Sequence, residues 1–198
     1  MKNHIVIPLS ELIAEESGYD IDKIKAAFAK FKCEREKDLC SFLVRHAIDY
    51  DQGNIGKTFL FLNESKIKQE QPEFQVDAYV TLATKGLDIS TLSKSKKKKV
   101  FGSYPGAESM NSISVFLIGQ LGRADYCSPE EISGEDLLNV CYSYFKKASV
   151  IVGGKLVFLE CREHMFNKFY EGQGFHKLKQ DLNEDNLYEL FTKIEFKD

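Results

Sequence analysis

The stretch that decides the fold reads ISVFLIGQLGR from Ile113 to Arg123 and, after a polar turn, ISGEDLLNVCYSYF from Ile132 to Phe145. The first half is a near-continuous apolar run rich in strand formers, which is typical of a strand buried on both faces. The second half has apolar residues at helical spacing, so the chain passes from strand to helix. A turn that ends in Ser-Gly before a helix presents backbone N–H groups and the positive end of the helix dipole, which suits a phosphate.

Upstream of this stretch, short apolar strands alternate with helical patterns. The clearest helix is predicted from Glu34 to Tyr50, where apolar residues recur every three or four positions opposite charged ones. Two runs rich in strand formers, Thr58 to Leu62 and Gln75 to Ala83, are expected to pair as an antiparallel hairpin. The shorter elements expected before them are a strand at Ile5 to Ile7 and helices at 10–15 and 21–28.

The periodicity is lost between Thr84 and Asn111. A basic low-complexity run from Lys94 to Lys99 lies in this segment and predicts a flexible Lys-rich insertion at about 86–110 within a single domain, 1–198. Blocks of like charge are usually solvated loops, and a contact with RNA or an acidic partner is the alternative interpretation.

After the central strand and helix, the chain returns to strands. Mixed strands with helices before, between and after them indicate an α/β or α+β architecture. The elements expected here are a strand at Lys155 to Cys161, a helix at His164 to Glu171, a strand beginning at Phe175 to Leu178, and a strand in the tail from Leu187 to Phe196.

Composition excludes several classes of protein. A formal net charge of −3 gives no global attraction to nucleic acid or to an anionic membrane. The sequence has neither a membrane span nor the pattern of a signal peptide, so we expect a cytoplasmic protein. Five cysteines, without a Cys-x-x-Cys pair, are expected to be reduced core thiols. The four histidines share no metal-ligand spacing with the cysteines, so no metal is implied.

Two short motifs carry a family resemblance. Phe169-Tyr170-Glu171 followed by Gly174-Phe175 resembles the end of the last helix and the start of the next strand in the GNAT acetyltransferase superfamily. The segment Leu117 to Leu121 resembles the central strand that precedes the acyl-CoA loop of that family. The order of elements is similar over residues 28–196. The resemblance implies a central mixed, mostly antiparallel sheet with a splayed parallel strand pair, flanked by helices.

The resemblance also implies acetyl-CoA as co-substrate. Its pantetheine arm would contact the backbone at the end of the central strand, where one N–H would polarise the thioester carbonyl. Its pyrophosphate would lie on N–H groups at the start of the following helix. The residues implied to bind the cofactor are Leu121, Gly122 and Arg123 in the strand, and Ile132, Ser133, Gly134 and Glu135 in the loop and helix.

The predicted pyrophosphate loop departs from the family pattern, because it keeps only the last glycine, Gly134. Ile132 cannot adopt the backbone dihedrals open to glycine. Glu130, Glu131 and Glu135 add negative charge where a diphosphate would bind. Carboxylates also stabilise a helix start without any ligand. A working cofactor site and a much weakened one therefore both remain open.

Tyr170 is the candidate catalytic residue. By resemblance it is the general acid that protonates the departing CoA thiolate. The alternative is an aromatic residue on the buried face of a short helix, beside Phe166 and Phe169. Glu163 occupies a position seven residues before the tyrosine that is often asparagine in the family.

No residue is assigned as the general base. Asp125 and Glu160 are the acidic residues nearest the tips of the two parallel strands, and His164 follows closely. None of the three belongs to a motif, and residues of these types are more often solvated loop charges or helix caps.

The sequence therefore predicts an N-acetyltransferase that transfers an acetyl group from acetyl-CoA to an amine of unknown identity. One alternative is a catalytically weakened GNAT-fold protein that binds a partner. Another is a toxin-like GNAT protein that acetylates aminoacyl-tRNA, which the acidic composition does not favour. No membrane partner is expected, and the oligomeric state stays open.

Overall fold

The computed structural model describes residues 1, 3–64, 74–102 and 106–194. Contacts divide the chain into two compact units, both discontinuous in sequence. The first consists of Met1–Ala83 and Ile118–Tyr144, and the second of Thr84–Leu117 and Phe145–Asp198. The single domain expected from the sequence stays a prediction. Each unit is described separately below.

The first unit contains four neighbouring strands in the order β1-β2-β3-β4. β1 pairs antiparallel with β2, and β2 pairs antiparallel with β3, which confirms the predicted hairpin. The strand bounds are His4–Pro8 for β1, Lys57–Asn63 for β2, Val76–Asp88 for β3 and Ser112–Arg123 for β4, the last two running on into the second unit. Its helices are α1 (Leu9–Leu12), η1 (Glu15–Ser17), α2 (Ile21–Lys30), α3 (Lys37–Arg45) and α4 (Ala47–Gln52).

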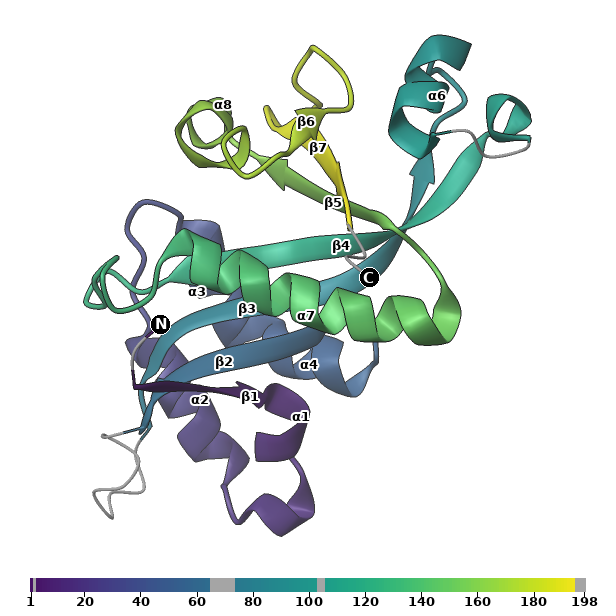
Figure 1. The fold of residues 1–198 in the computed structure, drawn as a ribbon. Helices are drawn as coiled ribbons and strands as arrows, with labels where there is room; N and C mark the ends of the chain where they lie inside the picture. Colours follow the sequence, from purple (N-terminus) through teal and green to yellow (C-terminus); the bar gives the residue numbers. More distant parts are fainter. Residues whose placement is uncertain (2, 65–73, 103–105, 195–198) are drawn as a thin grey trace. The chain divides into compact units, whose positions relative to one another are not determined.

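In the first unit, the N-terminal helices lie against one face of the sheet (Figure 1), and the period-2 pattern of β2 divides its side chains between the two faces. Leu60 and Leu62 enter the core that the strands share with α2, α3 and α4. Phe59 stacks on Tyr144 of α7 (Gly134–Val152), with ring centroids 3.9 Å apart. The sheet of this unit therefore lies between the N-terminal helices and the first part of α7.

The predicted helix from Glu34 to Tyr50 is wrong in one respect, because the chain breaks at His46 into α3 and α4. The break serves the second segment, where Asp51 is 1% exposed. Its carboxylate accepts the N–H of Thr58 at 3.0 Å and pairs with the Lys57 ammonium at 3.1 Å. A buried carboxylate must be paired, and Asp51 finds both partners in β2.

The second unit contains strands in the order β3-β4-β5-β7-β6. β4 and β5 run parallel, with Phe116 opposite Val157 and Leu117 opposite Phe158. The pairs β5–β7 and β6–β7 are antiparallel, so the expected mostly antiparallel sheet with one parallel pair is confirmed. The strand bounds are Leu156–Cys161 for β5, His176–Lys177 for β6 and Tyr188–Lys193 for β7.

The lysine run lies on a helix, α6 (Lys94–Phe101), where the lost periodicity predicted an irregular segment. Ser93 caps this helix by accepting the N–H of Lys96 at 3.2 Å. Val100 and Phe101 are buried in a core with Leu87 and Ile89. Only two apolar residues, Val100 and Phe101, anchor the helix. The lysines dominate the segment, so no amphipathic pattern could be recognised in the sequence. A short η2 follows at Ala107–Ser109.

The segment after β5 also differs from a regular helix. It consists of α8 (Glu163–Met165) and a π-helical turn, η3 (Phe166–Tyr170). The predicted tail strand extended to Phe196, which lies outside the described residues. Across the residues that are described, no helix combines the length and apolarity needed to cross a bilayer.

Candidate functional site

Arg123, the last residue of β4, ties the strand to the loop before α7. One guanidinium nitrogen donates to the carbonyl of Ile132 at 2.5 Å. The Nε atom of Arg123 is buried and has no hydrogen-bond partner among the described residues. A guanidinium is always charged, so Arg123 places a cation beside this loop. Its Nε–H group is a donor that has no acceptor among the described residues.

Gly122 is explained by packing. A Cβ at this position would come within 3.1 Å of Leu39 Cδ2 and closer still to Cδ1, so the backbone of β4 approaches α3 as only glycine allows. Leu39 also accepts, through its carbonyl, the phenol hydrogen of buried Tyr79 at 2.7 Å. The end of β4 is therefore held firmly against the first unit's core.

The glutamates of the loop bind their own turn. Glu131 Oε2 accepts the N–H of Ser128 at 2.8 Å. The pKa of Glu130 is lowered, first by a hydrogen bond from its own backbone and then by the Ser128 side chain. Both carboxylates therefore engage the turn that precedes α7.

Asp136 caps α7. It forms a reciprocal capping box, in which Ser133 N–H donates to Asp136 Oδ2 at 2.9 Å and Asp136 N–H donates to Ser133 Oγ at 3.0 Å. The Met1 ammonium pairs with Asp136 Oδ1 at 2.9 Å. The hydrogen bond from Ser133 is the main reason that the pKa of Asp136 lies below its usual range.

Two of the four N–H groups predicted to hold a pyrophosphate are therefore already engaged. The N–H of Ile132 donates to Ser128 O at 3.1 Å, and that of Ser133 to Asp136. Within the described part of the chain, no hydrogen bond uses the N–H of Gly134 or Glu135. The free donors at this helix start are those two amides and the Nε of Arg123.

Asp125, one base candidate, joins two loops of the first unit. Its carboxylate accepts the N–H of Glu34 at 2.7 Å and lies 3.5 Å from the Arg35 guanidinium. Its own N–H donates to Lys32 O at 2.8 Å. These contacts favour a structural role over a base.

Tyr170 lies in the second unit, at the end of the π-helical turn. The N–H of Glu171 donates to Phe166 O at 3.0 Å, which is the five-residue spacing of a π-turn. The ring of Tyr170 is buried between Phe169 at 5.0 Å and Phe175 at 5.5 Å, measured between centroids. The aromatic packing expected as the alternative is present, and isolated π-turns are frequent at functional sites.

A charged and aromatic cluster beside this turn was missed from the sequence. Tyr188 donates its phenol hydrogen to Glu163 at 3.2 Å. The Lys177 ammonium lies 3.6 Å from the ring centroid of Tyr188 and 4.7 Å from that of Phe166. The partners come from β6, β7 and the segment after β5, so no local spacing in the sequence could have revealed them.

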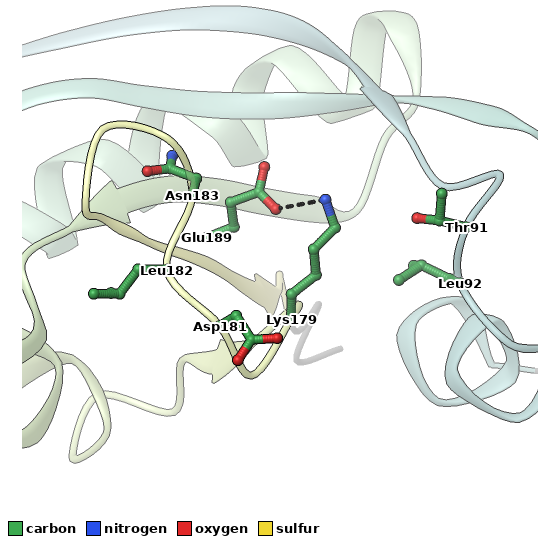
Figure 2. Close-up of a pocket in the computed structure, with 7 residues that line it drawn as sticks. All are labelled: Thr91, Leu92, Lys179, Asp181, Leu182, Asn183 and Glu189. Carbon is green, nitrogen blue, oxygen red and sulfur yellow. Dashed lines mark ion pairs between the residues drawn. The ribbon is translucent and has the colours of Figure 1, made fainter.

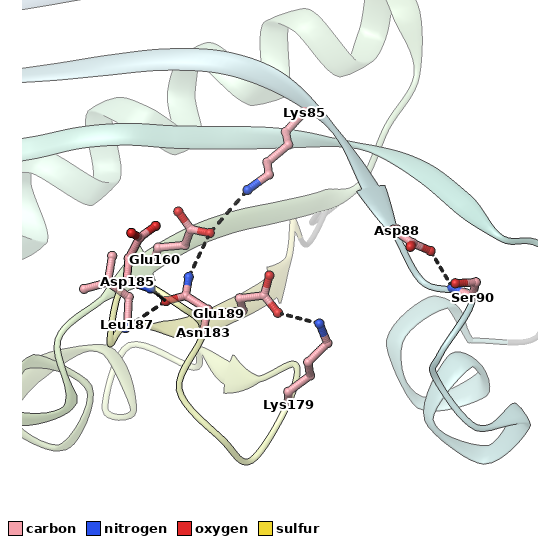
Figure 3. A network of polar contacts seen from close by, with 9 residues as sticks. All are labelled: Lys85, Asp88, Ser90, Glu160, Lys179, Asn183, Asp185, Leu187 and Glu189. Atoms are coloured by element: carbon pink, nitrogen blue, oxygen red, sulfur yellow. Dashed lines mark hydrogen bonds and ion pairs between the residues drawn. The ribbon is translucent and has the colours of Figure 1, made fainter.

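Glu160, another base candidate, belongs to a polar network of the second unit (Figure 3). Its Oε1 lies 3.3 Å from the Lys85 ammonium and 3.4 Å from the Asn183 side-chain nitrogen. Lys85 also lies 4.7 Å from the ring centroid of Phe158. His164 is exposed. Neither residue is brought to a partner that would make it a base.

The second unit also has a pocket of about 290 Å³ (Figure 2). The ion pair between Lys179 and Glu189, 3.2 Å long, forms part of its wall. Its lining combines one cation with two carboxylates. The lining residues are Thr91, Leu92, Lys179, Asp181, Leu182, Asn183 and Glu189.

Comparison with known proteins gave matches in structure only. No family model matches the sequence, and no curated protein matches it either. The AtaTR complex bound with AcCoA matches 98% of this chain and 95% of its own, at a TM-score of 0.66 and 22% identity. AtaT complexed with acetyl-methionyl-tRNAfMet matches 94% and 93%, at 0.64 and 22%. A tyrosine-to-phenylalanine mutant of KacT matches 98% and 96%, at 0.67 and 20%. The chain therefore shares the fold of these toxins, and the predicted resemblance to the GNAT superfamily is confirmed at the level of the fold.

Proposed function

We propose that this protein is an acetyl-CoA-dependent N-acetyltransferase. The observation that carries the proposal is the fold match, which extends over 98% of the chain to a toxin complex solved with AcCoA. Fold alone does not determine function, so the residues at the expected site must also fit the chemistry.

The residues at the start of α7 fit a diphosphate in part. The N–H groups of Gly134 and Glu135 lie at the N-terminal end of a 19-residue helix, where the helix dipole stabilises an anion. The buried Nε of Arg123 adds a charged donor beneath the same loop. The carboxylates of Glu130 and Glu131 are held by N–H groups of their own turn, which reduces their repulsion of an incoming diphosphate.

The family resemblance gives each candidate residue a role in acetyl transfer. In the first unit, a backbone N–H at Leu121, Gly122 or Arg123 would stabilise negative charge on the thioester oxygen. The acceptor nitrogen forms a bond to the acetyl carbon, the C–S bond breaks, and the nitrogen loses a proton to water or a base. In the second unit, the phenol of Tyr170 would donate its proton to the departing sulfur.

For the acceptor, we propose the α-amine of an aminoacyl-tRNA. AtaT, which has the same fold, has been solved with acetyl-methionyl-tRNAfMet. In this chain, a group of cations surrounds α6. Lys94, Lys98 and Lys99 are exposed on the helix. Two further lysines meet its C-terminal end, where Lys155 Nζ donates to Phe101 O at 2.8 Å and Lys193 Nζ to Lys99 O at 3.1 Å.

We call these five residues, Lys94, Lys98, Lys99, Lys155 and Lys193, the α6 lysine surface. Local cations of this kind can bind RNA phosphates even on a chain whose net charge is −3. The acidic composition weighed against a nucleic-acid acceptor in the sequence, but composition does not report how charge is distributed.

A non-catalytic binding protein is the second candidate, and the Met1–Asp136 pair favours it. That pair and the Ser133 cap engage part of the start of α7 without a ligand. If these contacts close the site, the chain would have kept the fold and lost the cofactor.

Isothermal titration with acetyl-CoA separates the two candidates, with desulfo-CoA and adenosine diphosphate as controls. The enzyme proposal predicts a Kd of about 1–100 μM for acetyl-CoA, within the usual range for substrates. Arg123→Gln should weaken acetyl-CoA and adenosine diphosphate alike, whereas Arg35→Gln, an exposed arginine of the same unit, should change neither. Absence of binding at millimolar acetyl-CoA would contradict the proposal and favour the binding protein.

A further inference from the structure

Three side chains of metal-binding type meet in the first unit. His4 lies in β1, Asp77 in β3, and Cys127 in the segment after β4. One ligand atom from each lies within 4.8 Å of the others. His4 Nε2 is 3.0 Å from Asp77 Oδ2, and the two side chains are 1% and 4% exposed. Cys127 is 4% exposed, so the group is removed from solvent.

The donor set matches one class of ion. Imidazole nitrogen, carboxylate oxygen and thiolate sulfur are the ligands of Zn²⁺ in proteins, at roughly 2.0–2.3 Å. Tetrahedral bonds of that length separate neighbouring ligand atoms by about 3.3–3.7 Å. The His4–Asp77 distance would open by a few tenths of an ångström, and rotation of the Cys127 side chain would bring its sulfur inward.

We propose that His4, Asp77 and Cys127 bind one Zn²⁺ ion, with a water molecule in the fourth position. The charges balance, because a neutral imidazole, a carboxylate and a thiolate together neutralise a divalent cation. Binding would release the thiol proton of Cys127 and any proton held between His4 and Asp77. A neutral complex is a favourable state for a buried carboxylate.

The neighbouring phenol does not compete for the ion. The neighbouring phenol belongs to Tyr126, whose hydroxyl already has an acceptor. That hydroxyl donates to Val76 O at 2.6 Å. The metal ligands are therefore the three residues whose atoms already face one another.

The site would have a structural role. Ala124 N–H donates to Asp77 O at 2.9 Å, and Cys127 N–H donates to Ala124 O at 3.1 Å. A zinc ion would add a bond between β1, β3 and this short segment, which leads into the loop before α7. The three ligands are separated by 73 and 50 positions in the sequence, so they form no recognisable motif.

Metal content and cobalt spectra test the site. Purified protein is stripped with a chelator, incubated with zinc, desalted and analysed by plasma mass spectrometry. We expect about one zinc per chain for the wild type, and loss of most of it in Cys127→Ser and His4→Gln. The matched controls are Cys161→Ser and His176→Gln in the second unit, which should retain the ion. Burial raises the pKa of Cys161 to about 11, so that thiol is inert.

Replacement by Co²⁺ gives a second readout independent of any activity. Thiolate ligation produces a near-ultraviolet charge-transfer band, which should be present in the wild type and in Cys161→Ser and absent in Cys127→Ser. Circular dichroism verifies folding, and Asp77→Asn replaces any variant that does not fold. A folded wild type that retains no zinc, or a cobalt band that persists without Cys127, would overturn the proposal.

Discussion

The two units use clusters of like charge in different ways. In the first unit, Glu131 before α7 and Asp136 in its first turn accept backbone N–H groups of their own segment, from Ser128 and Ser133. In the second unit, α6 uses only some of its lysines internally. Lys97 is buried and donates to Met110 O at 2.6 Å, whereas Lys98 is exposed. A charge cluster therefore indicates an external partner only after its internal partners are known.

The largest expected effect is on the rate of acetyl transfer. Tyr170→Phe in the second unit should lower kcat for acetyl transfer by roughly 10²–10⁴-fold, because the leaving sulfur loses its proton donor. The Kd for acetyl-CoA, measured by calorimetry, should stay unchanged. The control is Tyr144→Phe in the first unit, whose ring stacks on Phe59 and to which no catalytic role is assigned. A Tyr170→Phe enzyme with wild-type kcat would remove the assignment.

Within α6, the buried and exposed lysines should differ in their effect on stability. Lys97→Met keeps the aliphatic stem but removes a charged donor, so the free energy of unfolding should fall by about 1.5–3 kcal/mol. Lys98→Met, at an exposed position, should change it by less than about 0.5 kcal/mol. Urea denaturation measures both. Equal effects would mean that the Lys97 contacts are not formed.

At the start of α7, Asp136 and Glu135 form the corresponding pair. Asp136→Ala removes the capping box and should lower the free energy of unfolding by about 1 kcal/mol. Glu135→Ala, an exposed neighbour in the same helical turn, should have less than half of that effect. Thermal and urea unfolding at neutral pH provide the comparison, and a larger loss for Glu135→Ala would contradict it.

The lowered pKa of Asp136 predicts how the stability of the protein depends on pH. Its folded-state pKa is lowered, so its contribution to stability is present above the unfolded pKa of about 3.9 and is lost as pH falls through the folded value. The stability difference between wild type and Asp136→Ala should therefore be constant near neutrality and shrink below about pH 4. A difference that grows on acidification would show that the sign is wrong.

The smallest effect concerns RNA. The double substitution Lys98→Gln and Lys99→Gln should reduce the slope of log affinity against log salt for tRNA by about 1.5, since each lost phosphate contact contributes roughly 0.7–0.9. The control pair, Lys23→Gln and Lys25→Gln, is exposed on α2 in the first unit. Fluorescence anisotropy between low and moderate salt gives the slopes. Equal slopes for the two double variants would show that the α6 lysine surface does not contact tRNA.

Much of the fold could be predicted because alternating and helical patterns are local. The hairpin of β2 and β3, the central strand β4 and the parallel strand β5 all follow from such patterns. The break at His46 interrupts a continuous helical pattern, so periodicity alone could not predict it. The α6 helix was hidden because its lysines outnumber the two apolar residues that anchor it.

The residues of the candidate site were harder to predict from the sequence than the fold. Tyr170 came from a resemblance, and the spacing Ser133-x-x-Asp136 is the one local signal that could have indicated the helix cap. The contact of Met1 with Asp136 joins residues 135 positions apart, and the group His4, Asp77 and Cys127 is equally dispersed. Such contacts arise from topology, and one sequence does not specify topology residue by residue.

The proposed acetyl transfer to aminoacyl-tRNA can be measured in a transfer assay. The purified protein is incubated with radiolabelled acetyl-CoA and a fully charged tRNA pool, and the label in tRNA is measured before and after mild alkaline hydrolysis. We predict label in the charged tRNA, released by alkali as N-acetyl amino acid, and none with deacylated tRNA or with Tyr170→Phe. No label in charged tRNA, from a folded protein that binds acetyl-CoA, would contradict the account.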